Sequence, residues 1–447
     1  MALLPESKSS SDNGFLKAAW LVVALLWPVA LLNYLDRQML ASMKFSVMSD
    51  IPSIGSNENW GYMLGQFKWV YAFLSPLGGL IADRIGRKVT ICGSLFAWSL
   101  VTWWTSRATS YDELLMTRSL MGISEAFYIP AALALIADYH LGTTRSRAVG
   151  LHQIAIYCGV IMGGFGGYVA DAPQLGWRFA FFACGIVGML YTFPLLWCLR
   201  DAPAIAPSPG SEVSSPALDL FSSVTDVSRL RRNVFISLAI DLFSLLTNIS
   251  FILLILYFTL PALAGWVVRD WMPAILKEQF NIGQGKAGVA ATLYWQLAAI
   301  VGALVGGWLA DRWMQKNIRG RIYISAIGMA LIVPAIFGVG NASSLMMAIS
   351  FLILFGLGWG FFDGNNMPIL SQIVAPRLRA TGYGFMNMVS ISCGGLADWG
   401  FGKLRDQGVA LNLIFGVFAG AAVISVILVL LIRPNPAILQ QEQQARN

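Results

Sequence analysis

Long apolar runs recur from one end of the chain to the other, and they limit the possible folds more than any other feature. A run of about 20 apolar residues is long enough for a helix to cross the hydrocarbon core of a bilayer. Only 12% of the 447 residues are charged, about half of the roughly 25% found in soluble domains. Backbone groups in hydrocarbon must be satisfied within the protein, and a helix does so within one segment. The sequence predicts an all-α membrane protein with twelve transmembrane helices, at 17–43, 60–82, 89–108, 111–139, 145–170, 177–199, 249–278, 287–310, 322–340, 344–373, 379–402 and 411–433.

Two motifs occur twice at corresponding positions, which indicates an internal duplication. The segment GGLIADR at 78–84 recurs as GGWLADR at 306–312, and RSRAVG at 145–150 recurs as RLRATG at 377–382. The shifts, 228 and 232 residues, are nearly equal. Repeats of this kind are typical of secondary transporters. The chain is therefore predicted to form two pseudo-symmetric bundles of six helices.

The predicted domains are an N-terminal bundle at 1–199, a cytoplasmic linker at 200–248, and a C-terminal bundle with a short tail at 249–447. The linker begins with a Pro- and Ser-rich stretch, and its later part, 229–246, is basic and then apolar. We expect this later part to form a helix lying on the membrane surface. A thirteenth span is the less favoured alternative.

The basic residues between the spans predict the orientation. With both termini in the cytoplasm, nineteen Lys and Arg residues lie on the cytoplasmic side and seven on the other, as the positive-inside rule requires. The net charge of +7 therefore reflects orientation and not nucleic-acid binding. We expect a monomeric, multi-pass protein of the inner (plasma) membrane of a bacterium, with the lipid bilayer as its surroundings.

The first span contains two adjacent charges, Asp36 and Arg37. Charged side chains at this depth cost several kcal/mol, on the order of 3 or more, unless they are paired or face water. Adjacent residues on a helix point in different directions, so the two cannot neutralise each other. Each is expected to have its own partner on another helix.

The segment GGLIADRIGRK at 78–88 resembles the loop signature of the major facilitator superfamily, and the partial copy near 306 resembles the second copy common there. The glycines of 159–167 resemble that superfamily's close-packing pattern. The resemblance implies the major facilitator fold and alternating access. It also implies gating roles for the motif charges, which are Asp83, Arg84, Arg87, Asp311 and Arg312.

A narrower resemblance is to the anion:cation symporter family, which includes bacterial sugar-acid transporters and sialin. NYLDR at 33–37, FKWVY at 67–71, WMPAIL at 271–276 and the spacing of Arg118 and Glu125 carry it. The resemblance implies that Asp36 and Glu125 carry protons. It places Arg37, Tyr34, Tyr71 and Gln153 in the anion site.

Helix geometry supports part of this set. Arg118 and Glu125 lie on one face of the fourth span, two turns or roughly 10 Å apart. We expect Asp36 to pair with Arg118, and Arg37 to be shared between Glu125 and the substrate anion, because a guanidinium binds a carboxylate well. Lys68, beside Tyr71, is expected either to contact the anion or to extend outward to the lipid interface.

The duplication predicts a mirrored polar set in the second half. A shift of 233 residues carries Asp36-Arg37 to Arg269-Asp270, and a shift of 238 carries Glu125 to Asp363. Arg269 and Asp270 are expected to form part of a gate at the outer end of the seventh span, or to be solvated there. Asp363 and Asn366 are expected to line the cavity and bind substrate.

Other function classes find no support in the sequence. It contains no GxSxG, no nucleotide-binding GxxxxGK[ST] and no metal-ligand spacing among its five cysteines and two histidines, so no enzyme, ATP-driven pump, cofactor or metal is expected. The predicted function is proton-coupled symport of a small organic anion, with a sugar acid favoured. A lysolipid or sphingolipid transporter of the spinster type is the alternative, because it shares DR on span one and RxxxGxxEA on span four.

Overall fold

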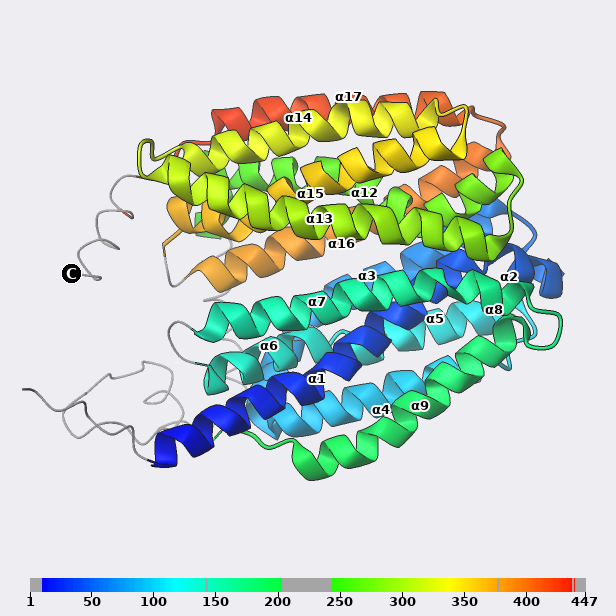
Figure 1. Ribbon diagram of the computed structural model, residues 1–447, viewed down its shortest axis with the longest axis horizontal. Coiled ribbons are helices and arrows are strands. Elements are labelled where there is room, and N and C mark those ends of the chain that lie inside the picture. The colour runs from blue at the N-terminus through cyan, green and yellow to red at the C-terminus, as the bar shows by residue number, and fades with distance from the viewer. Residues whose placement is uncertain (1–9, 141–143, 203–242, 376–377, 436–437, 439–447) are drawn as a thin grey trace, which may run out of the picture.

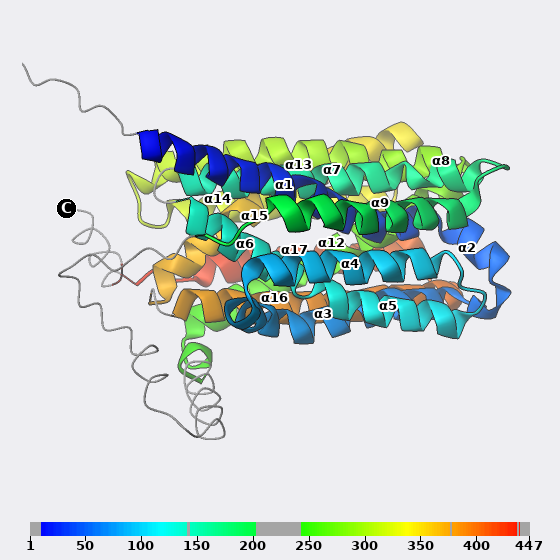
Figure 2. The same cartoon turned by 90° about the horizontal axis from the view of Figure 1, so that it is seen from below.

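The computed structural model describes residues 10–140, 144–202, 243–375, 378–435 and 438. Within these ranges the chain is helical, and no strand is assigned. The helices run nearly parallel to the long axis of the molecule (Figure 1). We call the end where α1 begins and α17 ends the terminal face, and the opposite end, where α2 and α8 lie, the distal face (Figure 2).

The described part of the first half contains nine α-helices and one short 3-10 helix. They are α1 (Ser10–Ser42), α2 (Lys44–Asp50), η1 (Pro52–Ile54), α3 (Asn57–Ile85), α4 (Arg87–Thr105), α5 (Tyr111–Glu125), α6 (Tyr128–Tyr139), α7 (Arg145–Gly164), α8 (Gly166–Asp171) and α9 (Gly176–Cys198). Side-chain caps account for several starts: Ser56 and Ser110 accept hydrogen bonds from Asn59 N and Glu113 N, satisfying donors that the helix leaves free. Gly86, with φ of +94°, ends α3 and permits the sharp turn into α4.

The described part of the second half contains six long helices. They are α12 (Ile249–Phe280), α13 (Gln284–Met314), α14 (Gly320–Gly340), α15 (Leu345–Ile373), α16 (Arg379–Asp406) and α17 (Leu411–Leu431). Asn248 caps the start of α12 through Ser250 N and Phe251 N. The predicted surface helix at 229–246 lies almost wholly outside the described residues.

The twelve predicted spans match the helices closely, with the fourth and fifth each broken once, between α5 and α6 and between α7 and α8. Nine spans in the described part of the chain are both long and apolar enough to cross a membrane. The other three correspond to α3, α4 and α16, which carry more polar residues. Two of these, α3 and α16, pack against each other across the two halves. The polar residues of α3 and α16 are therefore explained by a face that packs against protein and not against lipid.

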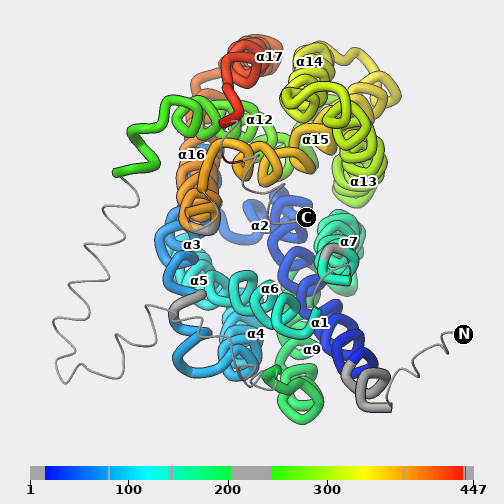
Figure 3. The backbone as a smooth tube through the Cα atoms, turned by 90° about the vertical axis from the view of Figure 1, so that its left-hand side faces the viewer, coloured from blue at the N-terminus to red at the C-terminus, as the bar shows by residue number. Residues whose placement is uncertain are grey.

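Each half packs mainly within itself. In the first half α1 packs on α7 and α4 on α9, and in the second α13 packs on α15 and α14 on α17. Seen from the terminal face, the helices of the two halves occupy opposite sides of the molecule (Figure 3). The halves meet through α3 with α16, and through α7 and α8 with α13.

Close packing across the halves depends on small residues of α7 and α13. A Cβ on Gly164 would collide with the backbone of Gly288, and a Cβ on Gly288 would collide with Gly164. The predicted close-packing role of the glycines at 159–167 is confirmed here. Backbones approach this closely in membranes only where side chains are absent or small.

The distal face is closed by polar contacts between the halves. Asp406 accepts hydrogen bonds from Asn57 N at 3.1 Å and Glu58 N at 2.7 Å. Gln284 donates to Asp171 at 2.9 Å and to Ser46 Oγ at 2.6 Å. Among the described residues, every hydrogen bond that joins the two halves lies at mid-depth or toward this face.

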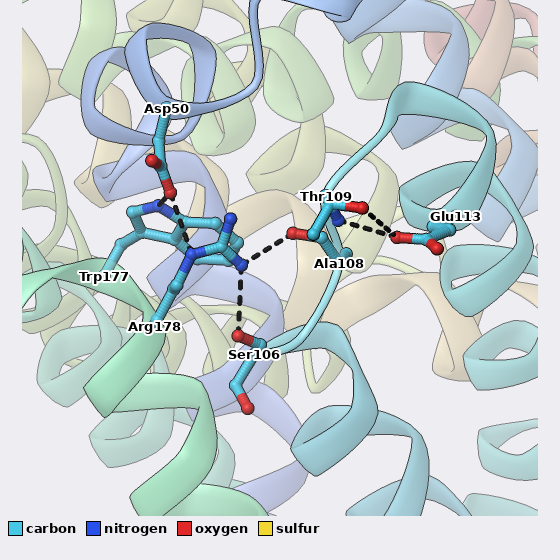
Figure 4. Close-up of polar contacts among 7 residues, drawn as sticks. All are labelled: Asp50, Ser106, Ala108, Thr109, Glu113, Trp177 and Arg178. Atoms are coloured by element: carbon cyan, nitrogen blue, oxygen red, sulfur yellow. Dashed lines mark hydrogen bonds and ion pairs between the residues drawn. The ribbon is translucent and has the colours of Figure 1, made fainter.

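Within the first half, Arg178 ties the distal loops together (Figure 4). Its Nε pairs with Asp50 at 2.8 Å, and its Nη1 donates to the carbonyl oxygens of Ser106 at 3.1 Å and Ala108 at 2.6 Å. Trp177 Nε1 donates to the same Asp50 oxygen at 3.0 Å. The distal end of this half is thereby a rigid platform for the contacts with the other half.

Candidate functional site

A cavity of about 320 Å³ lies at mid-depth between the two halves. Helices α1, α3, α6 and α7 of the first half and α12, α13, α15 and α16 of the second contribute to its wall. Its polar side chains are Tyr34, Tyr71, Gln153, Tyr157, Arg269, Gln296, Asp363, Tyr383, Asn387 and Ser390. A site built from both halves is what alternating access about a fixed centre requires.

A smaller cavity of about 80 Å³ lies next to the larger one and is strongly basic. Arg37, Lys68, Arg118 and Arg269 line it, with Asp270 as its acidic member. Tyr34, Tyr71, Trp266 and Arg269 belong to both cavities. The two cavities therefore adjoin and share part of their walls. The positively charged side chains line mainly the smaller one.

Arg37 is the centre of this basic region. Its Nε and Nη2 both lie 2.5 Å from Glu125 Oε2, which confirms the predicted pairing. The Glu125 side chain is fully buried, whereas that of Arg37 is 14% exposed. The guanidinium carbon lies 4.9, 4.7 and 4.9 Å from the ring centroids of Tyr34, Phe67 and Tyr71. Three aromatic faces thus hold the cation in place and leave part of it open to the cavity.

The predicted pairing of Asp36 with Arg118 is wrong. Although both residues are described, no ion pair joins them: Asp36 Oδ2 accepts from Thr102 Oγ1 at 2.9 Å, and Arg118 Nη2 donates to Thr105 Oγ1 at 3.1 Å. Both hydroxyls lie on α4, where the sequence argument singled out only motif residues at the start of the helix. Asp36 is therefore held within the first half and lines neither cavity.

Lys68 occupies a different position from the expected anion contact. Its Nζ lies 2.5 Å from Asp270 Oδ2 on α12 and in contact with Asp398 Oδ2 on α16. It also lies 4.2 Å from the ring centroid of Trp266. Its ammonium group thus joins the two halves, although its stem lines the small cavity.

Arg269 and Asp270 separate into two environments, although they are adjacent in sequence. Asp270 takes part in the contact with Lys68, as a gate residue should. The Arg269 guanidinium lines both cavities and lies 5.0 Å from the Tyr34 ring centroid, on which Arg37 also lies. Gln38 Nε2 donates to Arg269 O at 3.0 Å. The duplicated charges therefore meet at the centre of the molecule.

Asp363 lies in the wall of the large cavity, as the duplication predicted. Tyr34, Tyr71 and Gln153 line the same cavity. Asn366 does not. It is 1% exposed and belongs to neither cavity. It follows Asp363 by three residues on α15, and the prediction that it lines the cavity is wrong.

The repeated motif charges lie at the terminal face in both halves. Arg87 pairs with Asp83 at 3.2 Å and with Asp138 at 2.7 Å, and Arg321 pairs with Asp311 at 2.6 Å. Arg84 is exposed, and Arg312 lies over the Trp308 ring at 5.8 Å. Each motif aspartate therefore bonds an arginine at or near the start of the following helix.

Several site residues were missed by the sequence argument. Asp398 could have been found, because it is a lone carboxylate within a predicted span, the same signal that singled out Asp36. Tyr157, Gln296, Tyr383 and Asn387 are uncharged and lie outside any motif, so nothing in the sequence separated them from ordinary packing residues. The described residues contain no group of three His, Cys, Asp or Glu side chains placed to hold a metal.

Comparison with known proteins identifies the family. The family model described as Major Facilitator Superfamily matches residues 26–397. The chain belongs to the Major Facilitator Superfamily. It is a multi-pass membrane transporter and not an enzyme.

Two kinds of relative are similar to this superfamily member. Human "Protein spinster homolog 1" is 27% identical over 393 residues, which cover 83% of this chain and 70% of that protein. The "D-galactonate transporter" of Escherichia coli O6:H1 is 26% identical over 404 residues, covering 82% of this chain and 90% of that protein.

Solved structures share the fold. A bacterial homolog of the human lysosomal transporter spinster, in an inward-facing and unoccupied conformation, aligns with a TM-score of 0.71 at 19% identity over 93% of this chain and 95% of that one. A D-xylose-proton symporter aligns with a TM-score of 0.69 at 16% identity over 93% of this chain and 98% of that one.

Proposed function

We propose that this transporter carries a small organic carboxylate, a sugar acid in the favoured case, together with a proton. The observation that carries the proposal is the Arg37–Glu125 pair, buried in an aromatic cage and open on one side to a cavity that both halves line. A guanidinium held at this depth is a binding group for a carboxylate. Intramembrane charges of this kind mark substrate and proton pathways.

Coupling follows from competition for Arg37. When Glu125 accepts a proton on its carboxylate, the ion pair with Arg37 is lost, and the guanidinium is free to bind the carboxylate of the substrate. When the proton leaves, the glutamate recovers Arg37 and the substrate is displaced. Arg269, which comes from the opposite half and also lies over the Tyr34 ring, is the proposed second contact to the anion. Proton and anion therefore bind together and leave together.

The rest of the cavity favours a polyhydroxylated solute. Amide and hydroxyl groups of Gln153, Tyr157, Gln296, Tyr383 and Asn387 line it, and such groups hydrogen-bond the hydroxyls of a sugar. Asp363 adds an acceptor. A relative named for D-galactonate, a sugar acid, gives the proposal support from outside the site.

The second candidate is a lysolipid or sphingolipid, and one feature of the cavity favours it. Apolar side chains also contribute to the wall, namely Ile129, Leu133, Ile156, Val160, Phe258 and Phe362. An acyl chain would fit against these side chains while its head group met Arg37. The similarity to human spinster homolog 1 supports this candidate as well.

The orientation completes the proposal. With both termini in the cytoplasm of a bacterial cell, the distal face is the outer one, and the structure is closed to the outside. The cavity residues of α6, α7 and α16 then lie toward the cytoplasm. We propose that the protein works as a monomer in the inner membrane, with protons and one small anion as its partners.

A binding panel separates the two candidates. Thermal unfolding of the purified protein would be followed with D-galactonate, D-gluconate, or lysophosphatidylcholine, in the wild type and in Arg37→Gln. We expect stabilisation by a sugar acid that is lost in Arg37→Gln and kept in Arg405→Gln, a control at the distal face. Stabilisation by lysophosphatidylcholine alone would reverse the ranking.

A further inference from the structure

A second buried cluster of charges lies outside the proposed substrate contact. It consists of Lys68 on α3, Asp270 on α12 and Asp398 on α16, and we call it the distal triad. One ammonium group bridges two carboxylates. Lys68 comes from the first half, whereas both aspartates come from the second, so the triad exists only while the halves are in contact on this side.

The charge of the distal triad does not balance. Side-chain exposures are 5% for Lys68, 12% for Asp270 and 0% for Asp398. The second oxygen of Asp398, Oδ1, is buried without a hydrogen-bond partner. Transferring an unpaired carboxylate out of water costs several kcal/mol or more, and such a group becomes neutral instead. One lysine can neutralise one aspartate, and the other is left with an unsatisfied charge.

No other described cation forms an ion pair with the triad, although the charge of Arg269, next to Asp270 in the chain, acts on Asp270 from a greater distance. Arg269 on α12 lies over the rings of Tyr34 at 5.0 Å and Trp266 at 5.5 Å. Arg37 on α1 pairs with Glu125, and Arg118 on α5 bonds Thr105. Within the described part of the chain, none of these three arginines forms an ion pair with an aspartate of the triad.

We propose that the distal triad is a second proton-binding site, in which Asp270 and Asp398 share one proton when the distal face closes. With the proton bound, the triad holds one ammonium, one carboxylate and one carboxylic acid, and its net charge is zero. The acid hydrogen also lets one aspartate donate to the other, which two ionised carboxylates cannot do. This proposal goes beyond the substrate site and does not depend on which solute is carried.

The effect of pH on closure of the distal face follows from the number of protons bound in the closed and the open state. When the halves separate, Lys68 leaves with the first half, water reaches both aspartates, and the shared proton is released to the distal solution. The closed state thus binds one more proton than the open state. By linkage, lowering the pH favours the closed distal face, and raising it favours opening.

Spin labels across the distal face test the proposal without substrate. Asp112 at the start of α5 and Gln407 beyond α16 are exposed and lie on opposite halves. Cysteines placed there, in a full-length chain without its native cysteines, report the distance by double electron–electron resonance between pH 5 and pH 8. We expect the short-distance population to grow as the pH falls.

Asp398→Asn replaces the shared acid by a neutral amide and should keep the short distance at every pH in this range. Asp270→Asn should do the same, so a failure of one variant to fold does not end the test. Glu278→Gln is the matched control, because Glu278 pairs with Arg405 within one half at 3.6 Å, and it should keep the wild-type pH response. A wild-type response in both Asp398→Asn and Asp270→Asn would overturn the proposal, whatever the transport assays show.

Discussion

The two buried charge clusters of this transporter differ in how they are divided between the halves. Arg37 and Glu125 both belong to the first half, and their charges cancel. The distal triad takes its cation from one half and its two carboxylates from the other, with an excess of negative charge. A rigid-body motion of the halves leaves the first cluster intact and separates the second.

This difference assigns the clusters to different tasks. A pair that survives the motion can present one group to the substrate in every conformation, so competition for Arg37 controls binding. A cluster that must be broken controls which face is open. In one proposal the proton acts by displacing an ion pair, and in the other it acts by neutralising a charge that closure buries.

Arg37→Gln should have the largest effect, and it should impair the Arg37–Glu125 cluster while leaving the distal triad unaffected. A charge-assisted hydrogen bond contributes about 1.5–3 kcal/mol, so losing the proposed contact of the guanidinium with the anion should weaken binding by on the order of 10- to 100-fold. Isothermal titration with the stabilising sugar acid measures this loss. The pH response of the distal distance should remain. If that response disappeared with the affinity, the clusters would not be independent.

Lys68→Met should give the next largest effect, in the opposite region. Removing one partner of a buried ion pair costs about 3–5 kcal/mol, and here two carboxylates are left without a cation. We expect a lower unfolding temperature and a shift of the labelled population toward the open distance. Lys68→Met combined with Asp398→Asn should recover part of both losses. No recovery would argue against excess charge as the cause.

Asp363→Asn should have a smaller effect confined to substrate affinity. Asp363 lines the large cavity, and the substitution keeps its size while removing its charge. One neutral hydrogen bond contributes about 0.5–1.5 kcal/mol, so a change of roughly 2- to 10-fold in apparent affinity is expected. Uptake at several substrate concentrations measures it. Wild-type transport would remove Asp363 from the site.

Lys44→Gln should give the smallest effect. It tests how the closure of the distal face responds to alkaline pH. Lys44 contacts Asn57 and lies 4.7 Å from the Trp271 ring centroid of the other half. Burial lowers the pKa of Lys44 to about 8, against about 10.4 in water. Between these values the buried form is neutral and the exposed form is charged, so raising the pH there should favour closure. This alkaline response should be absent from Lys44→Gln, as seen in the same spin-label distance.

Much of the fold followed from the sequence because apolar runs and duplicated motifs are local signals. Ser56, Ser110 and Gly86 mark helix ends with ordinary caps and turns. The pairing of Arg37 with Glu125 could be predicted because both charges lie at similar depth on spans that the resemblance had brought together.

The errors have a common physical origin. Asp36 and Arg118 found hydroxyl partners on α4, and hydroxyl groups of threonine carry no sequence signal that distinguishes a bonding partner from a packing residue. Neither alternative considered for Lys68, an anion contact or extension to the lipid interface, included its ion pairs, because its acidic partners lie 202 and 330 residues away. Tertiary packing determines which helices of the two halves meet. The periodicity of residues within one span carries no information about these contacts.

The central claim is that Glu125 couples the proton to the anion through Arg37. Proteoliposomes containing wild type or Glu125→Gln allow a direct comparison of sugar-acid uptake driven by a pH gradient with counterflow exchange at equal pH. The account predicts that Glu125→Gln loses gradient-driven uptake and keeps exchange, since the amide leaves Arg37 free for substrate. Equal loss of both activities, or gradient-driven uptake at the wild-type rate, would contradict it.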